Sequence, residues 1–236
     1  MVRGIDMDYP QLTHGQLHSA ILRHIIDHGV APEVDGLAEN FGVSTDEMIV
    51  ALKSLADDHG VVLHPHTPKI WVIHPFSLAP TPFLLRAGDN EWWGNCAWCS
   101  LGAAALLDRD LTITTTLGAN GRQVDIRLQD GRLIDTDFVV HFPVPMMQAW
   151  DNVIYTCSTM LLFEDGDQVD DWSRRHGIAR GDVQPIERIW AFARVWYGRH
   201  LSPDWTKWTT DEARALFARF GLIGPIWHLP ESKTRF

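Results

Sequence analysis

Three cysteines are the side chains of this chain best suited to chemistry. Cys96 and Cys99 have the C-x-x-C spacing within an aromatic stretch, and Cys157 lies much further along the chain. Thiolates are strong nucleophiles and are the preferred ligands of soft metal ions. We therefore interpret Cys96, Cys99 and Cys157 as a candidate three-sulfur site that would hold a soft metal or attack an apolar small molecule.

Two ordinary explanations compete with a functional site. The C-x-x-C spacing is also that of redox dithiols, although no thioredoxin-like βαβ pattern flanks it here. Cysteine is also a common small core residue, and burial alone would explain Cys157 inside its apolar run. For Cys99 we expect function, because it is expected to begin a helix that continues to Leu107. The dipole at a helix N-terminus favours a thiolate.

The tryptophans offer a candidate pocket for an organic group. The chain has 11 of them, and Trp92, Trp93 and Trp98 flank the C-x-x-C pair. Such rings could wall an apolar cavity, although core packing is the simpler explanation for each ring singly.

Three histidines near a predicted hairpin could suggest a metal site. His64 and His66 flank a proline, however, and no carboxylate lies at a useful spacing from them or from His74. We interpret all three as polar or core residues rather than as metal ligands.

The elements that position these residues begin with a predicted winged-helix unit over residues 1–76. Apolar stripes and caps indicate helices at 14–28, 34–40 and 45–58, and alternating segments at 61–64 and 69–73 could pair as a hairpin. Winged helices often bind DNA. The predicted recognition helix has four acidic residues against Lys53 alone, so we favour a scaffold role.

A Pro-rich connector is expected at 77–90, followed by an α/β core domain over 91–236 with an extra C-terminal helix. Strands are predicted at 111–117, 123–128 and 138–142, and the apolar run 153–163 is predicted to be a buried strand that contains Cys157. Helices are predicted at 169–176, 186–197 and 209–220. The predicted fold class is therefore α+β.

The composition limits the kinds of partner that this chain is expected to bind. The chain has 236 residues, is 45% hydrophobic and has a net charge of -10. The acidic surface argues against nucleic acid as a partner. No apolar run is long enough to span a membrane, and the N-terminus does not have the pattern of a signal peptide. We expect a cytoplasmic protein that acts on a small molecule.

Three stretches together resemble the alkylmercury (organomercurial) lyases. Residues 97–101, Ala-Trp-Cys-Ser-Leu, resemble the family motif Ala-Trp-Cys-Ala-Leu-Asp, whose cysteine is catalytic. Residues 157–163, with Trp172 and His176 downstream, resemble the segment that contains the second catalytic cysteine. The helix 189–197 and the predicted winged helix also match the family architecture.

This resemblance implies roles for the residues. Cys99 would be the attacking thiolate and Cys157 the second mercury ligand. Cys96 is an addition to the family pattern, and its place one turn before Cys99 makes it a candidate proton donor or third ligand. The substrate would be an organomercurial, small cellular thiols would be partners, and no cofactor would be required beyond the bound mercury(II) or another soft metal. The family's carboxylate, which takes part in proton transfer, is absent, because Gly102 stands at its position. Other proton sources that we considered are Asp89, Glu91 and water.

The sequence therefore leaves three functions open. The first is a thiolate-dependent lyase that cleaves a carbon–mercury bond by protonolysis or performs related small-molecule chemistry. The second is a non-catalytic protein of the same fold that binds a soft metal or a small ligand, which the loss of the acid favours. The third is a winged-helix transcriptional regulator, which the charge disfavours.

Overall fold

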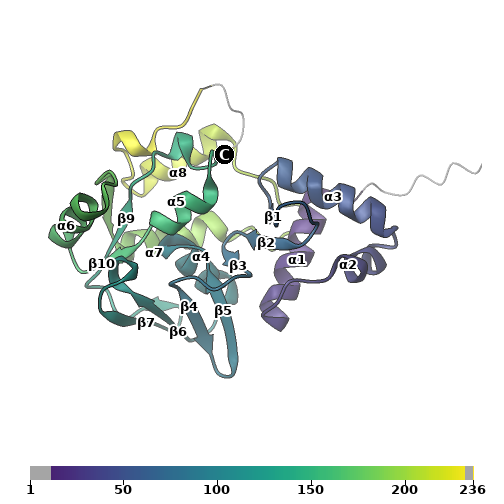
Figure 1. Ribbon diagram of the computed structural model, residues 1–236, viewed down its shortest axis with the longest axis horizontal. Coiled ribbons are helices and arrows are strands. Elements are labelled where there is room, and N and C mark those ends of the chain that lie inside the picture. The colour runs from purple at the N-terminus through teal and green to yellow at the C-terminus, as the bar shows by residue number, and fades with distance from the viewer. Residues whose placement is uncertain (1–11, 232–235) are drawn as a thin grey trace, which may run out of the picture.

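The computed structural model describes residues 12–231 and 236, and its first elements are three helices (Figure 1). They are α1 (His14–His28), α2 (Val34–Phe41) and α3 (Thr45–Asp57). Capping boxes at Thr13 and Ser44 begin α1 and α3, because each hydroxyl accepts the amide of the third helical residue. The strands β1 (Val62–Leu63) and β2 (Ile70–Ile73) follow as an antiparallel pair. The order of elements is the predicted one, and the winged-helix interpretation stays a prediction.

The larger sheet continues directly from this pair. Its order is β1-β2-β3-β5-β4-β6-β7-β8, and all its neighbours are antiparallel. The additional strands are β3 (Phe76–Ser77), β4 (Leu84–Ala87), β5 (Asn90–Gly94), β6 (Leu111–Thr116), β7 (Gln123–Gln129) and β8 (Arg132–Leu133). Residues 77–90, which we expected to be a connector, thus contribute to the sheet. A domain division at this point stays a prediction.

A second, smaller sheet and the remaining helices complete the fold. This sheet has the order β10-β9-β11, from β9 (Val139–Phe142), β10 (Leu162–Phe163) and β11 (Asp182–Pro185). The helices are α4 (Ala97–Leu107), α5 (Val153–Thr159), α6 (Gly166–His176), α7 (Ile186–Tyr197) and α8 (Thr210–Arg219), with short 3-10 turns at Leu117–Ala119, Met146–Gln148 and Pro225–Trp227. The α+β fold class is confirmed.

The predicted strand over 153–163 was wrong for its first part. Residues 153–159 form the helix α5, and only Leu162–Phe163 are a strand. The Asn152 side chain begins the helix by accepting the Tyr155 amide at 3.0 Å. The hydroxyls of Ser158 and Thr159 donate to the carbonyl of Tyr155. The Asn152 cap favours the start of a helix here, although the segment is apolar and partly β-branched.

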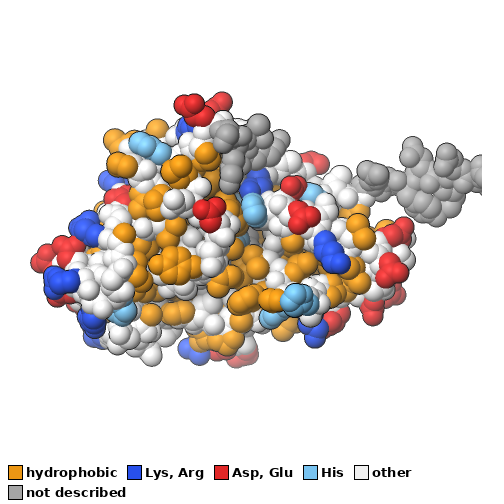
Figure 2. Space-filling view, turned by 45° about the horizontal axis from the view of Figure 1, so that its top comes forward, with side chains coloured by type: hydrophobic (Ala, Val, Ile, Leu, Met, Phe, Trp, Pro, Cys, Tyr) orange, Lys and Arg blue, Asp and Glu red, His pale blue; other side chains and the backbone are white. Residues whose placement is uncertain are grey.

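Helix α4 lies at the centre of the fold and packs along α7 (Figure 1). Ten of its 11 residues are buried, so the helix is apolar on every face, as expected for an element enclosed by others. The face shown in Figure 2 has hydrophobic side chains over much of its central surface, with charged side chains scattered among them and toward both ends. Within 12–231, no helix is long and apolar enough to cross a bilayer.

Candidate active site

The N-terminus of α4 positions two of the three cysteines. Cys96 is the N-cap residue, and its sulfur accepts the backbone N–H of Cys99 at 3.2 Å. Cys96 Sγ also lies 3.5 Å from the sulfur of Met160. The helix begins at Ala97, two residues earlier than the predicted start at Cys99, so Cys99 lies in its first turn and remains within reach of the helix dipole. Its own sulfur lies 3.5 Å from the hydroxyl of Tyr197 on α7.

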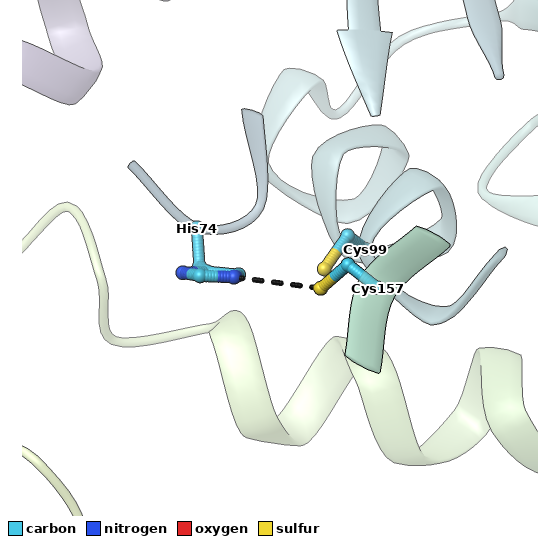
Figure 3. Close-up of side chains that lie close together, drawn as sticks. All are labelled: His74, Cys99 and Cys157. Carbon is cyan, nitrogen blue, oxygen red and sulfur yellow. Dashed lines mark hydrogen bonds between the residues drawn. The ribbon is translucent and has the colours of Figure 1, made fainter. Parts of the chain in front are cut away.

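Cys157 approaches the same place from α5. Its sulfur lies 3.7 Å from Nε2 of His74, which follows β2 in the turn before β3. The side-chain amide of Asn95 lies 3.2 Å from the same imidazole nitrogen. The donor atoms of His74, Cys99 and Cys157 all lie within 4.8 Å of one another. Figure 3 shows the three side chains lying together. Two sulfurs and one imidazole nitrogen form a suitable ligand set for a soft or borderline metal ion.

Cys96 has a different position from the one expected. It is fully buried and lines the same cavity, but the close cluster contains His74 in addition to Cys99 and Cys157. Its sulfur is engaged as a helix cap, so its role as third ligand or proton donor stays a prediction. From its sequence context we interpret His74 as a polar or core residue, and the structure places it against the sulfurs of Cys99 and Cys157 instead.

The three thiols differ in their tendency to ionise. Burial opposes ionisation of Cys99, but hydrogen bonds from Cys157 and Cys96 and the nearby His74 outweigh it and hold the pKa of Cys99 well below the ordinary thiol value. Burial raises the pKa of Cys96 well above that value. The pKa of Cys157 is also raised, because Cys96 and Cys99 hydrogen-bond to its protonated form. The site therefore favours one thiolate, at Cys99, beside two thiols.

A mostly apolar cavity opens onto these sulfurs. Its volume is about 80 Å³. Because about 10–15 Å³ of such volume is enough for one water molecule, a small organic group fits. Trp98 lines the cavity. Trp92 and Trp93 do not: Trp92 instead donates its indole N–H to the carbonyl of Ile25 in α1. The other tryptophans of the wall come from later parts of the chain: Trp150, Trp196, Trp205 and Trp208.

Tyr197 occupies the space beside Gly102. A Cβ atom built at Gly102 would lie 2.2 Å from Cδ2 of the Tyr197 ring, far inside van der Waals contact. The ring is 2% exposed, and burial raises the pKa of its phenol well above the ordinary value. A neutral tyrosine therefore fills the region where a longer side chain at position 102 would lie.

A buried histidine in the cavity wall gives a prediction for acid stability. His18 is 1% exposed and stacks on Trp205 with ring centroids 3.7 Å apart. Burial lowers the pKa of His18 from 6.5 to about 3, so between these values the unfolded chain binds a proton that the folded chain does not. Stability is therefore lost as the pH falls below 6.5. At pH 4.5 the loss from His18 is about 3 kcal/mol, at about 1.4 kcal/mol per pH unit.

Replacing His18 by phenylalanine keeps an aromatic ring against Trp205 and removes this proton. The free energy of unfolding is measured by denaturant titration at pH 7 and at pH 4.5. Its decrease between these two pH values should be about 3 kcal/mol smaller in His18→Phe than in the original chain. His228→Phe, at an exposed position, is the matched control. If the original chain and His18→Phe lose the same free energy of unfolding between these pH values, His18 is not the source of the acid sensitivity.

The fold and the site together define a thiol-containing α+β protein with an enclosed aromatic pocket for a small molecule. The family model of the alkylmercury lyases, MerB, matches residues 76–198, which is more than half of the chain. The chain belongs to the alkylmercury lyase family.

A solved structure has a similar fold. The crystal structure of the mercury-bound form of MerB2 superposes with a TM-score of 0.64 and 22% sequence identity, covering 78% of this chain and 91% of that one. At this identity the likeness shows the fold. No curated protein matches the sequence.

Proposed function

We propose that this protein cleaves the carbon–mercury bond of organomercurials by protonolysis, with Cys99 as the attacking thiolate and Cys157 as the second sulfur ligand. The observation that carries the proposal is the convergence of these two sulfurs in one buried cavity, although they come from different helices. Membership of the alkylmercury lyase family supports the same chemistry. The depressed pKa of Cys99 supports its assignment as the thiolate.

The reaction balances with one thiolate and one thiol. The Cys99 thiolate bonds to the mercury of an R–Hg group and displaces a small thiolate carried in with the substrate. The Cys157 sulfur then bonds to the same mercury, and the electron pair of the carbon–mercury bond moves to carbon, which takes a proton and leaves as R–H. The proton released by the Cys157 thiol balances the one taken by carbon. Mercury(II) stays between two sulfurs until small thiols remove it.

The test is to incubate the purified protein with a phenylmercury salt and an excess of a small thiol, and to measure benzene by gas chromatography. Catalytic release of benzene, well above the rate with thiol alone, is expected. Failure to release benzene above the thiol background would refute the lyase assignment. Measuring bound mercury per chain in the same samples separates lack of turnover from lack of binding.

A second candidate function is supported by His74. A third donor atom beside two sulfurs would hold a soft metal ion more tightly than two sulfurs alone, and Gly102 removes the family's acid. In that case the protein would be a non-catalytic soft-metal binder of the same fold. One mercury bound per chain, with no benzene released, would support this function over the lyase.

A further inference from the structure

The missing acid at position 102 and the tyrosine at position 197 are structurally linked. A Cβ at Gly102 would lie 2.2 Å from Cδ2 and 2.3 Å from Cε2 of Tyr197. No side chain can stand at position 102 while the ring of Tyr197 keeps its place. The absence of a carboxylate at this position is therefore the condition for Tyr197 to reach the site.

The tyrosine hydroxyl reaches the reacting sulfur. It lies 3.5 Å from Sγ of Cys99, and Tyr197 lines the cavity. The ring is fixed by its neighbours, with the centroids of the His200 and Trp98 rings 4.9 Å and 5.8 Å from its own. The O–H group is thus held beside the sulfur that would bond to mercury, inside the cavity that would hold the organic group.

The other oxygen acids considered from the sequence lie elsewhere. Asp89 and Glu91 are exposed on the β4–β5 hairpin, and Glu91 pairs with Arg86 at 2.6 Å. The described residues that line the cavity include no aspartate or glutamate. The other hydroxyl in the wall, that of Thr156, donates to the carbonyl of Ala149 at 3.0 Å. Tyr197 is therefore the oxygen acid that contacts a reactive sulfur.

We propose, on the basis of the lyase function above, that the phenolic O–H of Tyr197 delivers the proton to the carbon that leaves mercury. As the carbon–mercury bond breaks, its electron pair takes the Tyr197 proton, and R–H forms. The phenolate oxygen then takes the proton that the Cys157 thiol gives up when its sulfur bonds to mercury. Mercury ends between two sulfurs, and Tyr197 is neutral again. The tyrosine takes over, from a different helix, the proton transfer that the family assigns to a carboxylate at position 102.

The test is Tyr197→Phe, which keeps the ring against Gly102 and removes only the hydroxyl. Benzene release from phenylmercury in a single turnover should slow by about 10²-fold or more, the usual contribution of a general acid. Mercury bound per chain should stay the same, because both sulfurs remain. The matched control is Tyr155→Phe, the same change at an exposed position of α5, which should release benzene at the original rate.

Three outcomes would overturn the proposal, and they are distinguishable. Release by Tyr197→Phe at the original rate would exclude the hydroxyl as proton donor and leave the lyase function standing. Loss of both mercury binding and release would assign Tyr197 a structural role instead. Absence of release in the original chain, with mercury bound, would overturn the lyase function and the tyrosine proposal together.

Discussion

Replacing Cys99 by serine is expected to abolish hydrocarbon release from an organomercurial. Cys99 is the thiol whose pKa is held well below the ordinary value, so it supplies the thiolate. A serine hydroxyl stays protonated in this site and is a hard, weak ligand for mercury. We expect the single-turnover rate of benzene release to fall by at least about 10³-fold, the scale seen when a catalytic nucleophile is removed.

Cys96→Ser is the matched control for this prediction. Serine is a preferred N-cap residue, so its hydroxyl can accept the Cys99 amide as the Cys96 sulfur does. The variant removes one thiol from the cavity and preserves the start of α4. We expect a loss of release of less than about tenfold, because a cap of similar strength replaces the old one. A loss as large as that of Cys99→Ser would contradict this assignment and return Cys96 to the site as a ligand or proton donor.

Much of the fold could be predicted because local signals and burial agree. Capping boxes at Ser44 and Thr209 precede α3 and α8: α3 begins at the predicted residue 45, and α8 begins one residue after the predicted start at 209. The hairpin strands β6 and β7 were found from alternation, which the structure shows as alternating burial in β7. Residues 153–159 were assigned to a strand because an apolar, β-branched run has no decisive period. The polar side chain that caps this helix, Asn152, lies just before the run.

The candidate site could be predicted only in part. The cysteines of the close cluster, Cys99 and Cys157, were found through residue type and motif. His74 was considered as a metal ligand and set aside, and Tyr197 was not singled out, because nothing in their local sequence distinguishes a ligand or an acid from a core residue. Their roles depend on distances across the fold, 3.7 Å to Cys157 and 3.5 Å to Cys99. Gly102 was the available signal: a glycine inside a buried helix often marks the close approach of another element.

The same close approach predicts the effect of restoring the family's acid. Gly102→Asp alone should destabilise the protein and should not improve turnover. The new Cβ would overlap the Tyr197 ring, and overpacking in a core typically costs about 1–3 kcal/mol, to which burial of a carboxylate adds. For a chain of this size, a loss of about 3 kcal/mol lowers the melting temperature by about 6–12 °C. Differential scanning fluorimetry would measure the shift.

The double variant Gly102→Asp with Tyr197→Ala tests whether the two positions exchange one role. Tyr197→Ala removes both the hydroxyl and the ring, so it should release benzene slowly and also lose stability from the cavity left behind. Adding the aspartate places an acid in that space, and the double variant should release benzene faster than Tyr197→Ala alone. Residues in direct contact are expected to be non-additive in this way. If the double variant is no faster than Tyr197→Ala, a carboxylate at position 102 does not replace the tyrosine, and the glycine would serve only to let α4 and α7 pack closely.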